Sequence, residues 1–209
     1  MSRYRSLPLK FFRRSAEVVA PDLLGRFLVC RLENARLVVR IVETEAYLGS
    51  CDRASHAWQG RRTPRNESLY RPGGLAYVYF IYGMYHCLNV VTGDAENGDA
   101  VLIRAAEPIE GVAMMAANRG LSRSPRPGDL AGGPGKLCQA LRIDRSLDGR
   151  ALQKEPVAIT WGVPVDPLDV SKGSRIGIDY AAEAVDWQLR FAIAGNPHVS
   201  RPYPWRGTH

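Results

Sequence analysis

The order of the strand-like segments limits most what this 209-residue chain can fold into. Residues 26–32, 37–42, 77–82 and 85–91 are rich in β-branched and aromatic types, and no regular helical pattern separates them. Parallel strands need long crossovers, usually helices, whereas antiparallel neighbours can be joined by a tight turn. The pattern therefore predicts an α+β fold, with an antiparallel sheet and helices to one side.

Turn residues indicate how the strands connect. Residues 33–35 fit a hairpin loop, and Gly83 permits a second reversal that places Tyr82 near a hairpin tip. Short helical segments are expected within 15–25, with Ser15 or Asp22 as caps. Further strands are predicted at 100–107, 156–163 and 190–194, and a helix at 109–118.

The length suits one well-filled core, so we expect a single domain over residues 1–209. The four cysteines, at 30, 51, 87 and 138, form no C-x-x-C pair, and we expect reduced thiols with no metal and no cofactor. The N-terminal segment has no apolar signal region, and no run is long enough to span a membrane. We therefore expect a cytoplasmic, nucleoid-associated monomer.

The chain is basic, with a formal net charge of +7. Such a charge favours an anionic partner such as nucleic acid, although a basic protein without a polyanionic ligand fits equally well. Arginines recur in loop-like segments where phosphate contacts would hold a duplex: Arg53, Arg61, Arg62, Arg65, Arg71, Arg119, Arg123 and Arg126.

Residues 42–47 alternate apolar and polar side chains, so Glu43, Glu45 and Tyr47 are expected on one face of a strand. A carboxylate beside basic and aromatic side chains can deprotonate a water, and a tyrosine stack can bind a flat, electron-poor ring. Both requirements meet in the hydrolysis of a bond to a nucleobase, where a carboxylate offsets an oxocarbenium-like charge. The nucleotide must leave the duplex before it can react, and Tyr82 suits the wedge that fills the gap.

Residues 127–141 form a glycine-rich loop that enters a helix, an arrangement that can present backbone N–H groups to a phosphate. It is not a Walker A loop, because Leu130 and Leu137 occupy positions that the motif reserves for Gly and for Ser or Thr. A turn that closes over the core explains the pattern as well as a contact to the nucleic-acid backbone.

Several blocks resemble the alkyladenine (3-methyladenine) DNA glycosylases, in a form similar to the bacterial members. They are residues 43–49, 61–66, 77–85, 132–141 and 190–200, and together they cover most of the chain in order. The resemblance implies a compact domain with a curved antiparallel sheet and a protruding hairpin that inserts into DNA. It also implies a monofunctional glycosylase that removes alkylated or deaminated purines, such as 3-methyladenine, 7-methylguanine, hypoxanthine and ethenoadenine, from double-stranded DNA.

The resemblance also assigns roles to residues. It implies that Glu45 is the general base, that Arg104 lies beside the catalytic water, and that the carbonyl of Ile193 helps to hold that water. Base binding falls to Tyr47, His56 and Tyr79, exclusion of normal guanine to Asn89, and intercalation to Tyr82.

Each assignment has a structural alternative in the residues themselves. Strand alternation cannot choose between Glu43 and Glu45 as the base. His56 and Asn89 suit ordinary structural roles, Tyr77 suits core packing, and Arg104 suits a salt bridge with Glu43 or Glu107. Two other functions also stay open: a non-catalytic nucleic-acid or damage-binding protein, and a hydrolase of small molecules such as nucleosides.

Overall fold

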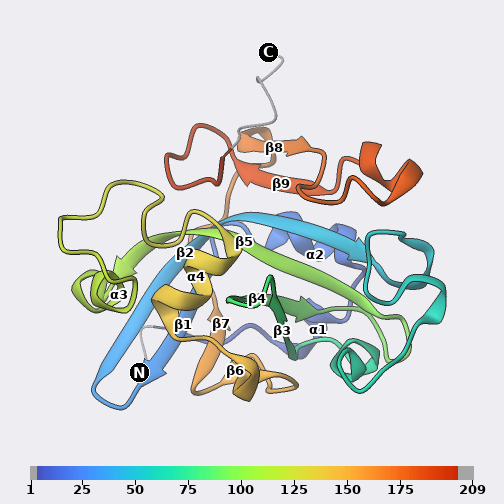
Figure 1. Cartoon of the computed structure of the whole chain (residues 1–209), viewed down its shortest axis with the longest axis horizontal. Coiled ribbons are helices and arrows are strands. Elements are labelled where there is room, and N and C mark those ends of the chain that lie inside the picture. The colour runs from blue at the N-terminus through green and yellow to red at the C-terminus, as the bar shows by residue number, and fades with distance from the viewer. Residues whose placement is uncertain (1–3, 202–209) are drawn as a thin grey trace.

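The computed structural model describes residues 4–201, and its organising element is the long strand β2 (Ala35–Leu48). Most of this strand is buried, in keeping with its run of β-branched and aliphatic residues. It pairs with β5 (Asp99–Glu110) along almost its whole length. These two strands form the centre of a curled antiparallel sheet (Figure 1).

One side of the sheet continues from the first half of β2. The strand β1 (Phe27–Leu32) pairs with it as the predicted hairpin, and Leu32 lies opposite Ala35. Beyond β1 come β7 (Val157–Thr160) and the short β6 (Gln153–Lys154). All strand pairs described here are antiparallel, so the predicted α+β class with an antiparallel sheet is confirmed.

On the other side, β5 pairs with β4 (Tyr85–Val91), which pairs with β3 (Ala76–Ile81) as the second predicted hairpin. Both Tyr82 (φ 54°) and Gly83 (φ 68°) have left-handed backbones at its turn. Glycine adopts this region readily, but an aromatic residue seldom does.

The second half of β2 has a different neighbour. Its residues 43–45 pair with β9 (Arg190–Ile193), which in turn pairs with β8 (Val170–Gly173). The pairing of β2 with β5 also shifts register on both sides of Glu43. Bulges of this kind redirect side chains, so the two predicted acids lie where the sheet is least regular.

Four α-helices flank the sheet: α1 (Leu9–Phe12), α2 (Ala16–Asp22), α3 (Val112–Asn118) and α4 (Pro134–Leu141). The apolar faces of α2 and α4 join the main hydrophobic cluster with Val78, Leu88 and Ile103 of the sheet. The described chain also has six short 3₁₀ helices: Gly49–Cys51, Trp58–Gly60, Glu67–Tyr70, Arg145–Leu147, Pro167–Asp169 and Ala182–Asp186.

Two local predictions differ from the structure. The expected helix at 109–118 begins only at Val112, because Gly111 (φ 84°) ends β5 and starts the helix. Ser15 precedes α2 as predicted but makes no side-chain cap hydrogen bond, and Asp22 is the last residue of that helix. The ends of the predicted domain, 1 and 209, lie outside the described residues.

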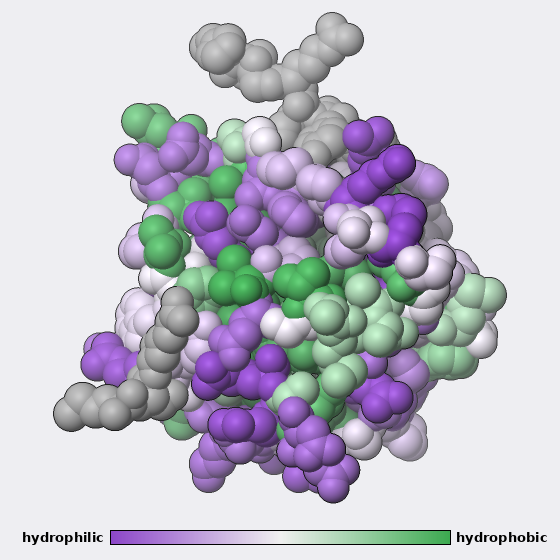
Figure 2. Space-filling model, turned by 90° about the vertical axis from the view of Figure 1, so that its left-hand side faces the viewer, coloured by the Kyte–Doolittle hydropathy of each residue, from purple (hydrophilic) through white to green (hydrophobic). Residues whose placement is uncertain are grey.

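The surface is mixed in polarity. Figure 2 shows one face on which hydrophobic residues gather in a band across the middle, with hydrophilic residues around it. Within residues 4–201, no helix combines the length and the apolar character that crossing a membrane requires.

Candidate active site

Strand alternation gives the sheet two different faces. The side chains of Val78, Leu88 and Ile103 enter the main core, whereas those of the intervening residues face the other way. These line a cavity of about 360 Å³, within the usual size range of small-ligand pockets. The strand residues that line the cavity are Tyr47, Tyr77, Tyr79, Ile81, Tyr85, Cys87, Asn89, Ala100, Leu102 and Arg104.

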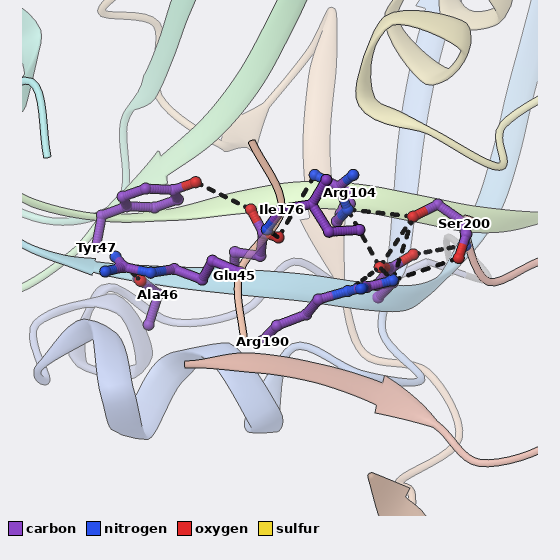
Figure 3. Close-up of polar contacts among 9 residues, drawn as sticks. Glu45, Ala46, Tyr47, Arg104, Ile176, Arg190 and Ser200 are labelled. Atoms are coloured by element: carbon purple, nitrogen blue, oxygen red, sulfur yellow. Dashed lines mark hydrogen bonds and ion pairs between the residues drawn. The ribbon is translucent and has the colours of Figure 1, made fainter. Parts of the chain in front are cut away.

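Glu45 is fully buried directly behind the wall of this cavity. Its Oε1 accepts a hydrogen bond from the backbone N–H of Ile176 at 2.9 Å and lies 3.4 Å from Nη1 of Arg104. Its Oε2 accepts from the hydroxyl of Tyr47 at 2.9 Å. All three partners line the cavity, and Figure 3 shows the carboxylate lying among them. A carboxylate oxygen can accept two hydrogen bonds, so Oε2 can still accept one from a water.

Glu43 is equally buried but has a different environment. Its Oε1 accepts from Nε of Arg190 at 2.6 Å and lies 3.2 Å from Nε of Arg104, and its Oε2 accepts from the N–H of Ser200 at 2.7 Å. The Ser200 hydroxyl donates to the same carboxylate at 3.0 Å. Glu43 therefore belongs to a structural network with Arg190 and Ser200. Arg104 contacts this network and also lies beside Glu45, as Figure 3 shows.

Tyr47 connects Glu45 to the cavity. Burial raises the pKa of Tyr47 well above its ordinary value, and the nearby charge of Glu45 adds to the shift. The hydroxyl therefore stays protonated and donates to Glu45. The guanidinium of Arg175 lies 4.7 Å from the centre of the Tyr47 ring, and its Nη2 donates to Oδ1 of Asp52 at 2.9 Å.

His56 forms an aromatic cluster with Tyr77 and Tyr79. Its Nδ1 lies 2.8 Å from the Tyr77 hydroxyl, and its ring packs edge-on to Tyr79 with centres 4.6 Å apart. Burial lowers the pKa of His56, and the charges of Arg65 and Arg61 lower it further. The imidazole is therefore neutral at pH 7 and presents one donor and one acceptor nitrogen.

Asn89 and Tyr82 reach the cavity from the second hairpin. The Asn89 side chain is buried, and its Nδ2 donates to the carbonyl of Tyr77 at 3.2 Å. Tyr82 lines the cavity although 79% of it is exposed, so it lies at the cavity opening.

Ile193 does not line the cavity and, unlike Glu45, makes no hydrogen bond to a lining residue within residues 4–201. It is the last residue of β9 and lies opposite Val170 of β8. The β9 residue that pairs with Glu45 is Arg190, three positions earlier. The carbonyl of Ile193 accepts a hydrogen bond from the N–H of Asn196 at 3.2 Å. Ile176 lies against Glu45 instead, from a loop that the sequence pattern did not single out.

Tyr77 is buried, as core packing predicts, but its hydroxyl also hydrogen-bonds His56 at the cavity wall. Tyr77 lies two residues before Tyr79 and therefore on the same strand face, and this spacing could have indicated that both tyrosines reach the cavity. Residues 174–181, which carry Ile176 and Tyr180 to the cavity, have no periodic pattern that would have identified them.

Two glycines of the glycine-rich segment, one before α4 and one in its first turn, have packing reasons. A Cβ on Gly132 would lie 2.6 Å from Cα of Gly128, and one on Gly135 would lie 2.9 Å from the ring of Tyr85. Close chain approach therefore accounts for both residues. Over residues 4–201, no cluster of three or more His, Cys, Asp or Glu side chains is arranged to hold a metal ion.

The chain matches the family model described as methylpurine-DNA glycosylase over residues 10–197. Its relatives include proteins of Clostridium botulinum (44% identity; 92% of this chain and 97% of the relative) and Natranaerobius thermophilus (43%; 93% and 98%). A protein of Myxococcus xanthus is 44% identical over 95% of both chains. All three are named, provisionally, 3-methyladenine DNA glycosylase. The chain belongs to the methylpurine-DNA glycosylase family.

Proposed function

We propose that this protein is a monofunctional DNA glycosylase of base-excision repair. It hydrolyses the N-glycosidic bond of alkylated or deaminated purines in duplex DNA, including 3-methyladenine, 7-methylguanine, hypoxanthine and ethenoadenine, and leaves an abasic site. Family membership and the names of the relatives support the class of reaction. The observation that carries the proposal is the buried carboxylate of Glu45, fixed by three donors that line an aromatic cavity.

Glu45 is the general base. It accepts a proton from a water that uses the second acceptor position of Oε2, while the water oxygen bonds to C1′ of the damaged nucleotide. The bond between C1′ and the base nitrogen breaks, and its electron pair leaves with the base. A cationic alkylated purine becomes neutral, whereas a neutral purine such as hypoxanthine leaves as an anion that takes up a proton from water. The negative charge of Glu45 also offsets the oxocarbenium-like charge on the sugar. Arg104 and the Ile176 N–H keep the carboxylate in place during the reaction.

The aromatic cavity receives the base, which must first rotate out of the duplex. Tyr47 and Tyr79 offer ring faces to a flat purine, and neutral His56 offers a hydrogen-bonding nitrogen. Asn89 lies in the wall, where its side chain crowds the extra amino group of normal guanine. Exposed Tyr82 is the wedge that fills the space left in the duplex.

The test uses duplexes with one hypoxanthine, ethenoadenine or 7-methylguanine, followed by alkali to cleave abasic sites. We expect strand breaks with the wild-type protein and at least about a 100-fold slower single-turnover rate with Glu45→Gln, since general bases contribute about that much. The exposed Glu33, in the β1–β2 loop, supplies the matched control Glu33→Gln, which should match the wild-type rate.

Two results would contradict the proposal. Lesion binding without base release, for every lesion tested, would indicate a damage-binding protein. Cleavage of free nucleosides at the rate found for DNA would indicate a nucleosidase.

A further inference from the structure

A second exposed aromatic residue lies at the opening of the cavity. Tyr180 lines it and is 70% exposed, compared with 79% for Tyr82. Tyr82 comes from the β3–β4 hairpin, whereas Tyr180 comes from the segment that follows β8. Tyr82 also contributes to the raised pKa of Tyr180, after burial and the charge of Asp52, which is consistent with the two rings lying near each other.

The backbone that carries Tyr180 is fixed on both sides. Ile178 and Ala181 are buried in a cluster with Ala54 and Ala184, and the N–H of Ala181 donates to the carbonyl of Ile178 at 2.8 Å. Earlier in the segment, Arg175 forms a fully buried ion pair with Asp52. The Tyr180 ring is therefore exposed to solvent on a backbone segment that packing and hydrogen bonds hold in place.

Within the described chain, few polar contacts involve the Tyr180 side chain. Its one polar contact within residues 4–201 is a long hydrogen bond of 3.5 Å from its hydroxyl to the carbonyl of Ala54. Large apolar surface exposed on a rigid backbone beside a binding cavity is typical of a contact residue.

The way in which a nucleotide enters the cavity indicates what the Tyr180 ring contacts. A nucleotide that rotates out of a duplex stays bonded to its two neighbours, so the damaged strand must cross the opening at which Tyr180 lies. We propose that Tyr180 packs against a nucleotide next to the extruded one, on the damaged strand. This inference rests on the proposed function, and it separates Tyr180 from Tyr82, which fills the gap inside the duplex.

The test measures dissociation constants by fluorescence anisotropy for ethenoadenine duplexes, with Glu45→Gln in every protein to prevent turnover. Removal of one stacking contact typically weakens binding by about 5- to 150-fold. We expect Tyr180→Ala to weaken binding to the intact duplex about tenfold and Tyr180→Phe, which keeps the ring, by less than about twofold. Leu168→Ala is the control, because Leu168 is 94% exposed and does not line the cavity.

Two further duplexes locate the contact. In each, the damaged strand ends at the lesion, on its 5′ side in one and on its 3′ side in the other. The penalty of Tyr180→Ala should disappear on the duplex that lacks the contacted neighbour and persist on the other. An effect of Tyr180→Ala no larger than that of Leu168→Ala on the intact duplex would overturn the inference, and so would a penalty that persists on both shortened duplexes. Base release by the protein with native Glu45 tests the proposed function separately.

Discussion

Glu43 and Glu45 are the same residue type, two positions apart on one strand, yet their surroundings give them different tasks. Glu43 is bonded to Arg190 and Ser200, away from the cavity lining. Within residues 4–201, the hydrogen bonds and the ion pair of Glu45 go to groups that line the cavity. The shift in pairing between β2 and β5 on both sides of Glu43 permits this division. The first acid is therefore structural, and we assign the chemistry to the second.

This division predicts a stability effect at Glu43. Substitution Glu43→Gln removes the negative charge from a network that holds Arg104 and the fully buried Arg190. Removing one partner of a buried ion pair typically costs about 3–5 kcal/mol, because the other charge stays buried without compensation. We expect urea denaturation to show a loss of unfolding free energy of that size.

The half-exposed Glu107, which lies 3.6 Å from Arg40, supplies the comparison. Its variant Glu107→Gln should lose less than about 1 kcal/mol, as partly exposed pairs usually do. Equal losses for the two variants would contradict the structural role of Glu43.

At the scale of elements, the two hairpins were predictable because their turns and strand residues act locally. The β1–β2 and β3–β4 pairs depend on adjacent sequence, and Gly83 marks the second reversal. The 174–181 segment was not predictable in this way. Ile176 reaches Glu45 across 131 positions, and only tertiary packing brings the two together. No local pattern places a backbone N–H relative to Glu45, so the contact of Ile176 could not be predicted, and the role of the Ile193 carbonyl stays a prediction.

The start of α2 depends on a similar distant contact. Asp99, the first residue of β5, accepts a hydrogen bond from the N–H of Ala16, the first residue of α2. The pKa of Asp99 is raised to about 6. Burial is the main cause and the charge of Asp52 adds to it, whereas the hydrogen bond from Ala16 lowers the pKa. The Asp99 side chain thus bonds a free N–H at the start of α2, where Ser15 makes no cap hydrogen bond.

This pKa predicts how stability depends on pH. The unfolded pKa of Asp is about 3.9, so between about pH 4 and 6 the folded state binds more protons than the unfolded state. The contribution of Asp99 is therefore fully present below about pH 4 and is lost as the pH rises through about 6. Asn keeps the acceptor oxygen and never ionises, so Asp99→Asn should gain stability relative to wild type between pH 4.5 and 8. Urea denaturation at pH 4.5 and pH 8 measures the unfolding free energies of the variant and the wild type. If the difference between the two proteins were the same at both pH values, the prediction would be wrong.

At the scale of the whole molecule, the net charge is +7, but some of the positive side chains are already paired with carboxylates and are less available to bind a partner. Several arginines are committed to carboxylates: Arg62 lies within 2.6 Å of both Glu67 and Glu96, and Arg123 lies 2.7 Å from Asp129. Arg61 differs from these. Its side chain makes no hydrogen bond or ion pair within residues 4–201, and its charge lowers the pKa of His56, which lines the cavity.

Arg61 is therefore the arginine we expect to contact a phosphate beside the damaged nucleotide. The affinity for lesion duplex should fall as salt increases, and each lost phosphate contact should reduce the slope of log K against log salt by about 0.9. Titration of Arg61→Gln between about 50 and 200 mM salt should give a slope smaller by about that amount. Arg31→Gln makes the same change in net charge, but Arg31 lies on β1, paired with Glu155 and outside the cavity lining. Its slope should match wild type, because counterion release depends on contacts and not on overall charge. Equal reductions in both variants would mean that the duplex responds to net charge alone and that Arg61 makes no phosphate contact.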